Sequence, residues 1–413
     1  MSSSTGDELE TLQKQYLSLY PLYLLSIPLP KFLVEMQNQH YLIDELLGER
    51  YQPENEYKRK FWRKVLQVME MGMKEVEEEG EDENENDLEI DERFYDVLTE
   101  LMIAKGGPST FDKPASSFRT FIYNMPHSHP FVQPQRQPQR PSTSTRASPE
   151  NEIGKGKITL VEEQIAIQGG TTGLRTWTAA LHLAHHILLH PQSIFQDPTT
   201  IDRGIIELGA GTGFLSILLS QLGVNVISTD LGDEAPSDDQ DQARETKDED
   251  VEKVETHVQS ESITPLARLK SNVSSESQLM CKIKLDDLDE IQVKSLDWTE
   301  ASLHSPERPE IWDTLENERR TIIAADVIYD PILIPPLVNT INRLIGDSKA
   351  ECIISATVRN QTTFDGFVNT CKQHNLSVKE IDVPPMDEKN PTFWDSALDK
   401  GTQVKILRIT RRT

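Results

Sequence analysis

Alternating glycines after a short apolar stretch are the feature of this sequence most suited to chemistry. The stretch ends at Glu207 and is followed by Gly209, Gly211 and Gly213. Residues 214–222 then have the apolar spacing of a helix, so the sequence predicts a strand, a glycine turn and a helix. Because glycine has no Cβ, backbone N–H groups and the helix N-terminus can approach a ligand there. The turn is predicted to bind a polar ligand; the alternative is that its glycines only permit tight helix packing.

The spacing of these glycines distinguishes between two kinds of ligand. A dinucleotide fingerprint, G-x-G-x-x-G, requires a third glycine where the chain has Phe214. The observed pattern, Glu207 followed by three alternating glycines, resembles the first motif of S-adenosylmethionine-dependent methyltransferases. The next predicted strand ends at Asp230, whose carboxylate can accept hydrogen bonds from both ribose hydroxyls of a nucleoside.

Two tryptophans follow predicted strands at positions where they could contact the same ligand. Trp177 closes a turn rich in glycine and threonine that opens onto a predicted helix, residues 178–189. Trp298 follows Asp297, a pair suited to stacking on a purine and accepting from its amino group. For both tryptophans the alternative is an ordinary place in the hydrophobic core.

Asp326 ends another predicted strand, residues 321–326, and Tyr329 follows it. Ligands of open α/β sheets bind beyond the carboxyl ends of the strands, which is where these side chains would project. His182 and His186 have the i, i+4 spacing that places two imidazoles on one helix face. The sequence offers no obvious third ligand, so we expect packed or surface histidines and no metal.

Composition limits the function further. The formal net charge of −26 disfavours a surface that follows nucleic-acid phosphates, and no nucleic-acid partner is expected. Cys281, Cys352 and Cys371 are too far apart in sequence to suggest a disulfide framework or a zinc knuckle. Prolines interrupt the apolar residues 17–34, and the first residues lack the features of a signal peptide. We expect a cytoplasmic protein that does not enter a membrane.

The chain divides by composition into three parts. Residues 1–105 have helical spacing and are predicted to form an N-terminal helical domain, interrupted by an acidic linker at 75–92. Residues 106–152 are predicted to be a Pro/Ser/Gln-rich linker, and residues 153–413 a ligand-binding domain with an acidic disordered insertion at 232–261.

Lysines and arginines surround Phe61 and Trp62 in the helical part. An RNA-contacting patch is one interpretation; a solvated helix face with the aromatic side chains packed inward is favoured.

The motifs GGTTGLRTW, IELGAGTG, TD, LDW and AADVIYDP occur in this order. Together they resemble the lysine methyltransferases of methyltransferase family 16. The resemblance implies an α/β fold, a seven-strand Rossmann-like class I methyltransferase sheet whose last strand is antiparallel, with an N-terminal helical domain. It implies S-adenosylmethionine as cofactor and Asp326 and Tyr329 as catalytic residues beside the incoming lysine. It also implies a set of cofactor-binding residues: Trp177, Glu207, Gly209, Ala210, Gly211, Asp230, Trp298 and Ala325.

The segments KRKFWRKVL and ATVRNQTTF resemble those members of the family that methylate elongation factor 2. The implied function is protein-lysine N-methylation, with elongation factor 2 as the protein substrate and the enzyme as a monomer. Alternatives are methylation of another protein, methylation of a small molecule, and a non-catalytic cofactor-binding partner of a translation factor.

Overall fold

The structure is a computed structural model of the 413-residue chain. It describes residues 5–79, 89–104, 116–126, 129–130, 154–163, 173–196, 200–232, 264–274, 291–304, 307–395 and 401–412. The predicted domain boundaries at 105 and 153, most of the predicted linker 106–152, the predicted insertion apart from Gly232, and the turn residues 169–172 lie outside these ranges.

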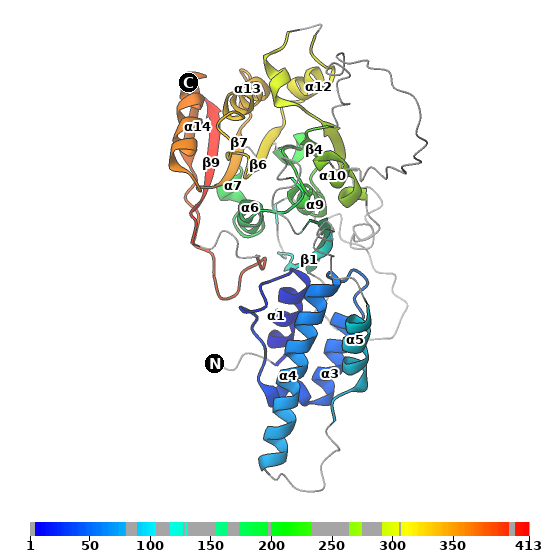
Figure 1. The fold of residues 1–413 in the computed structure, drawn as a ribbon. Coiled ribbons are helices and arrows are strands. Elements are labelled where there is room, and N and C mark those ends of the chain that lie inside the picture. Colours follow the sequence, from blue (N-terminus) through cyan, green and yellow to red (C-terminus); the bar gives the residue numbers. More distant parts are fainter. Residues whose placement is uncertain are drawn as a thin grey trace, which may run out of the picture.

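The N-terminal part is helical, as predicted (Figure 1). Its elements are α1 (Thr5–Leu17), α2 (Pro30–Val34), α3 (Met36–Tyr41), a π-helical turn (Leu42–Leu47), α4 (Asn55–Glu79) and α5 (Glu92–Ile103). Tyr16, Phe61 and Trp62 are buried together, with 4.2 Å between the ring centroids of Tyr16 and Phe61. The inward packing favoured for the two α4 aromatic residues is therefore confirmed.

Helix α4 extends further than the sequence indicated. Residues 75–79, assigned to an acidic linker at 75–92, continue the helix, and that part of the prediction is wrong. Met73 and Val76 pack partly buried against the core of the helical part. Burial of this apolar stripe stabilises the last turns in spite of their acidic composition.

An antiparallel pair of strands lies between the helices and the main sheet (Figure 1). It consists of β1 (Ser117–Asn124) and β2 (Lys155–Glu162). The sequence analysis missed β1, because it placed these residues in the linker 106–152. Phe121 and Tyr123 join the core beneath the main sheet, while Ile122 packs against the core of the helices. Alternation of side chains along β1 thus connects the two cores.

The main sheet has seven strands in the order β5-β4-β3-β6-β7-β9-β8. The strands are β3 (Ile205–Leu208), β4 (Val226–Asp230), β5 (Gln292–Ser295), β6 (Thr321–Ala325), β7 (Cys352–Thr357), β8 (Leu376–Glu380) and β9 (Val404–Arg411). Strand β9 is antiparallel to both of its neighbours, and the pairs on the β3 side are parallel. This confirms the α/β class and the seven-strand Rossmann-like sheet with an antiparallel last strand.

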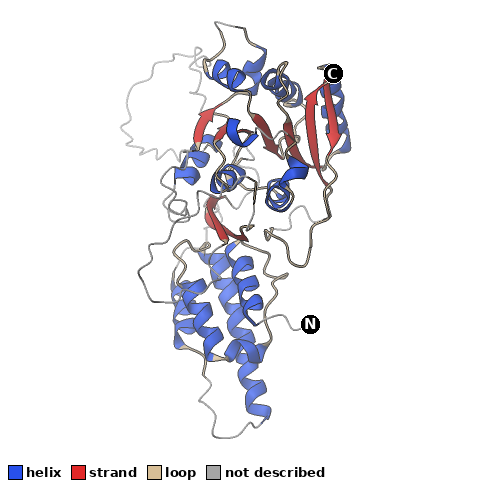
Figure 2. Ribbon diagram, turned by 180° about the vertical axis from the view of Figure 1, so that it is seen from behind, coloured by secondary structure: helices blue, strands red, loops and turns tan. Residues whose placement is uncertain are grey.

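Helices cover both faces of the sheet (Figure 2). One face packs on α6 (Thr178–Leu189) and α9 (Phe214–Gln221), the other on α12 (Ile311–Glu318), α13 (Ile334–Ile345) and α14 (Gln361–Gln373). Neighbouring residues of β3 enter opposite cores: Ile205 contributes to the first and Ile206 to the second. Burial on both faces explains why these strands are continuous apolar runs.

The remaining described elements are short: α7 (Pro191–Ile194), α8 (Thr200–Arg203), α10 (Pro265–Ser274) and the 3₁₀ helix η4 (Trp298–Ser302). Within the described ranges, no helix combines the length and hydropathy that a membrane span requires.

Candidate functional site

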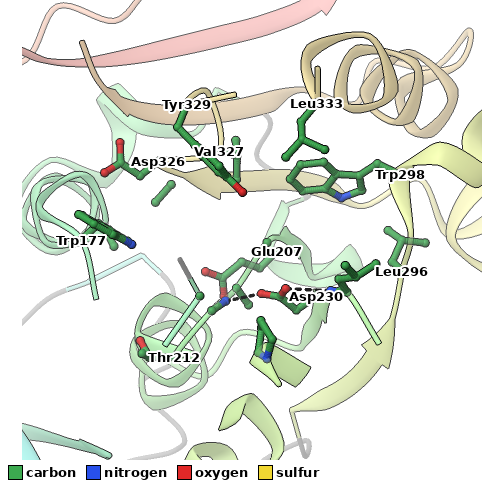
Figure 3. Close-up of a pocket in the computed structure, with 18 of the residues that line it drawn as sticks. Trp177, Glu207, Thr212, Asp230, Leu296, Trp298, Asp326, Val327, Tyr329 and Leu333 are labelled. Atoms are coloured by element: carbon green, nitrogen blue, oxygen red, sulfur yellow. Dashed lines mark hydrogen bonds between the residues drawn. The ribbon is translucent and has the colours of Figure 1, made fainter. Parts of the chain in front are cut away.

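A cavity of about 690 Å³ opens at the carboxyl ends of the central strands (Figure 3). Strand β3 lies between β4 and β6, so the cavity occupies the point where chain connections leave in opposite directions, the usual ligand position in such sheets. The cavity brings together every residue that the sequence analysis assigned to cofactor or catalysis: Trp177, Glu207, Gly209, Ala210, Gly211, Asp230, Trp298, Ala325, Asp326 and Tyr329. The structure places all of them at one cavity, and their roles in cofactor binding and catalysis stay predictions.

The first and last glycines of the turn have positive φ and lie close to side chains of other elements. Gly209 has φ +64°, and a Cβ there would lie 3.0 Å from Val327 Cγ1 and 3.3 Å from Trp298 Cζ2, inside the cavity. Gly213 has φ +84°, and a Cβ there would lie 2.8 Å from Leu269 Cδ1 on α10. A Cβ at the first glycine would crowd two residues that line the cavity, and its absence at the last permits tight helix packing.

Asp230 ends β4 with its carboxylate fixed by the glycine turn. Its Oδ2 accepts a hydrogen bond from the backbone N–H of Gly211 at 2.6 Å, and its Oδ1 accepts from Leu231 at 2.8 Å (Figure 3). Burial raises the pKa of Asp230, and these two backbone donors act in the opposite direction. The carboxylate lines the cavity in one fixed orientation, as recognition of a ribose diol requires.

Glu207 lies beneath the turn and is almost fully buried. It accepts a hydrogen bond from the hydroxyl of Ser216, which also lies 2.8 Å from the Ser228 hydroxyl. Burial raises the pKa of Glu207 to about 8, and the nearby charge of Asp230 adds to the rise. Glu207 is therefore largely neutral at pH 7 and belongs to the floor of the cavity.

The walls of the cavity fit an aromatic nucleoside ligand. Trp177 and Trp298 face each other across it, with Asp230 and Glu207 below (Figure 3). Both tryptophans are only partly buried, so neither is an ordinary core residue, although Trp298 also packs against the second core. Apolar walls with a few oriented polar groups are typical of cofactor sites.

Asp326 lies at the opposite edge of the cavity, immediately after β6. Its φ of +58° is unusual for a residue with a side chain and costs on the order of 1 kcal/mol. Three donors offset that cost: the Thr357 N–H at 2.9 Å, the Thr357 hydroxyl at 3.2 Å and Arg359 Nη2 at 2.9 Å. The bend at Asp326 directs the following loop, with Tyr329, over the cavity.

Arg359 contacts both Asp326 and Trp177 at this edge of the cavity. Besides its ion pair with Asp326, its guanidinium carbon lies 4.9 Å from the ring centroid of Trp177. The sequence analysis used its segment only for the resemblance and assigned it no role. Asp330, which lines the cavity beside Tyr329, was also missed. It directly follows residues 326–329, Asp-Val-Ile-Tyr, which we call the D-x-x-Y segment, and this position is the signal that could have identified it.

A buried arginine connects the helical part to the cavity. Arg119 donates to the carbonyl of Ser18 at 2.8 Å and to Glu162 Oε2 at 3.2 Å. Glu162 Oε1 accepts from the Thr176 N–H at 3.2 Å, and the hydroxyls of Thr176 and Thr212 lie 2.7 Å apart. Both threonines line the cavity, so a continuous polar network reaches it from the end of α1.

The α6 histidines lie apart from this cavity. The ring centroids of His182 and His186 are 4.7 Å apart, and burial lowers the pKa values of these residues to about 4 and about 3. Both are neutral at physiological pH. Among the residues that the structure describes, no group of three or more potential ligands could hold a metal ion.

A family model described as lysine methyltransferase matches residues 157–280 and 261–374, more than half of the chain. Protein-lysine N-methyltransferase EFM3 from Chaetomium thermophilum is 30% identical over 268 residues, 63% of this chain and 65% of that protein. EFM3 from Saccharomyces cerevisiae is 22% identical over 59% of this chain and 61% of its own length. Human Protein-lysine N-methyltransferase EEF2KMT is 28% identical over 51% of this chain and 53% of its own length.

In these three alignments the chain spans between 53% and 65% of the relatives' own length. The family model covers the glycine turn, Asp230 and the segment from Asp326 to Arg359. These parts contribute to the cavity and its edge. The chain belongs to the lysine methyltransferase family.

Proposed function

We propose that this chain is an S-adenosylmethionine-dependent protein-lysine N-methyltransferase. The observation that carries the proposal is the single cavity in which the glycine turn, Asp230 and the D-x-x-Y segment meet, in a member of the lysine methyltransferase family. When bound, the cofactor would supply a methyl carbon made electrophilic by a sulfonium.

The residues of the cavity suit the parts of that cofactor. The carboxylate of Asp230 is held by two backbone donors in an orientation that can accept from the ribose hydroxyls. The indole of Trp298 offers a face for the adenine ring. The missing Cβ atoms of Gly209 and Gly211 leave the backbone of the turn accessible to the ligand.

The protein's contribution to methyl transfer is alignment and control of the lysine's proton. Trp177 and Tyr329 would form the walls that guide the side chain, and the anchored Asp326 keeps the loop that carries Tyr329 in place. An ammonium has no lone pair, so the lysine must lose its proton before it reacts. Tyr329 is 46% exposed, so water at the mouth can take that proton.

We further propose elongation factor 2 as the substrate and the cytoplasm as the place of reaction, with the enzyme acting as a monomer. The name of the human relative, EEF2KMT, supports this substrate, as does the resemblance of KRKFWRKVL and ATVRNQTTF. The alternatives are another protein, a small-molecule acceptor, and cofactor binding without catalysis.

The test is transfer of labelled methyl from S-adenosylmethionine to purified elongation factor 2, with the modified residue located by mass spectrometry. Asp230→Ala should abolish labelling, whereas Asp202→Ala, an exposed aspartate on α8 outside the cavity, should not. Labelling of a lysine supports both proposals. If another protein in a lysate is labelled instead, the named substrate is wrong; cofactor binding without any transfer would refute the enzyme.

A further inference from the structure

We propose that Asp330 binds the ammonium group of the substrate lysine at the mouth of the cavity. The inference rests on the proposed function and assigns a substrate-binding role to a residue outside the predicted site. Five carboxylates line the cavity, and their surroundings distinguish them: Glu207, Asp230, Asp297, Asp326 and Asp330.

Two of them belong to the floor. Glu207 is 3% exposed and accepts from the Ser216 hydroxyl, so it offers little surface to an incoming side chain. Both oxygens of Asp230 accept backbone hydrogen bonds, from Gly211 and Leu231. A cation at either carboxylate would occupy the space that the proposed cofactor needs.

Asp297 lies at the far side of the sheet. It follows β5, the edge strand, whereas Tyr329 follows β6, which is separated from β5 by β4 and β3. One oxygen of Asp297 already accepts from the N–H and the hydroxyl of Thr299, each at 2.8 Å. This carboxylate caps η4 beside Trp298 and is remote from the D-x-x-Y segment.

Asp326 is on the correct side, but its carboxylate is already engaged. The carboxylate accepts hydrogen bonds from the backbone and hydroxyl of Thr357 and from the guanidinium of Arg359. Asp326 as a whole is only 9% exposed. A lysine ammonium could bind there only by displacing Arg359, which also stacks on Trp177. Asp326 is therefore a positioning residue that fixes the loop above the cavity.

Asp330 is partly buried, lies on that loop and directly follows Tyr329. Its Oδ1 accepts from the backbone N–H of Ile332 at 2.9 Å, which fixes the carboxylate in a turn before α13. Its Oδ2 accepts no hydrogen bond from any residue that the structure describes. A preoriented carboxylate at the cavity, next in sequence to an aromatic residue that also lines it, is suited to receive an ammonium group.

This position separates binding from methyl transfer. Asp330 attracts the charged form of the lysine at the mouth, the proton leaves to water there, and the neutral amine then advances between Tyr329 and Trp177. Loss of the charge at Asp330 should therefore raise KM for the protein substrate and leave kcat and cofactor affinity nearly unchanged.

The experiment compares Asp330→Asn with Asp387→Asn in steady-state methylation of the protein substrate by the full chain. Asp387 is a matched control: it is exposed, outside the cavity, and its Oδ1 also accepts from the N–H two residues ahead, at 2.9 Å. Asparagine can keep this hydrogen bond in both turns, so neither change should disturb folding. Asp330→Asn should raise KM up to about fivefold, the range of a solvated ion pair, and Asp387→Asn should not.

Two further readouts distinguish charge from structure. Asp330→Lys should raise KM by about tenfold or more relative to the wild type, because like charges repel. Asp330→Glu keeps the negative charge, so its KM should stay close to the wild-type value. Added salt should raise KM of the wild type more than that of Asp330→Asn. Unchanged KM in both Asp330→Asn and Asp330→Lys, or a fall in kcat alone, overturns the assignment. A wild-type chain that methylates no protein refutes the proposed function and with it this inference.

Discussion

Glu207→Gln should remove a pH dependence of stability that originates in the floor of the cavity. Glu207 is buried beneath the glycine turn, and desolvation of its carboxylate raises its pKa from 4.5 to about 8. The charge of Asp230 contributes in the same direction, while the Ser216 hydroxyl opposes it. Glutamine has nearly the same shape, stays neutral at every pH and keeps a side-chain oxygen for Ser216.

The sign follows from the two pKa values. The folded chain holds the Glu207 proton more tightly than the unfolded chain, so this group's contribution to stability is fully present below pH 4.5. It is lost progressively as the pH rises through about 8. At ~1.4 kcal/mol per pH unit, the difference between the two pKa values corresponds to a loss of about 5 kcal/mol, which is a ceiling because water can enter the cavity.

The assay is urea unfolding of the full chain without cofactor at several pH values between 5 and 9. The free energy of unfolding of the wild type should fall by several kcal/mol more than that of Glu207→Gln across this range. Glu388→Gln, a change at an exposed glutamate outside the cavity, serves as the control and should retain the wild-type slope. Parallel profiles for the wild type and Glu207→Gln would refute the reasoning.

Three other perturbations test the network around the cavity. Arg119→Met leaves Glu162 buried without its cation and should cost about 3–5 kcal/mol in urea unfolding, part of which Glu162→Gln should restore; purely additive losses would contradict this. Gly209→Ala should weaken cofactor binding at least tenfold by calorimetry, because φ is +64° and the added Cβ lies 3.0 Å from Val327; wild-type affinity would argue against it. Arg359→Met should lower kcat about tenfold, and Arg359→Lys should rescue it poorly because an ammonium lacks the planar fork. Full rescue by lysine would show that charge alone suffices.

Local pattern predicted most of the sheet, and its failures have a physical cause. Strand β3 and helix α9 were predictable because their apolar spacing and glycine turn lie within one short segment. Strand β1 was not, because Arg119 and Thr120, which point to opposite faces, each bury a polar side chain. Their partners, Ser18, Glu162 and Thr159, lie more than thirty residues away in sequence. Burial of polar residues that satisfy one another leaves no hydrophobic alternation to detect.

The members of the cavity were predictable from motifs, whereas the state of each side chain was not. Asp326 was predicted beside the lysine, and it does line the cavity. That its carboxylate is occupied depends on Thr357, the last residue of β7, and on Arg359, which follows that strand. The sequence likewise did not indicate that Glu207 is neutral at pH 7, because desolvation depends on packing of the whole turn.

Arg119 makes the cavity dependent on the N-terminal helices. It is 1% exposed, and its guanidinium contacts the end of α1 through Ser18 and lies 3.6 Å from Asp395. Asp395 in turn accepts a hydrogen bond from the hydroxyl of Thr178 at 2.5 Å. Thr178 is the first residue of α6 and directly follows Trp177. A buried charge is tolerated only while its partners are in place. Displacement of α1 would therefore disturb the contacts that hold the Trp177 wall, so the helical part stabilises the cavity as well as adding surface.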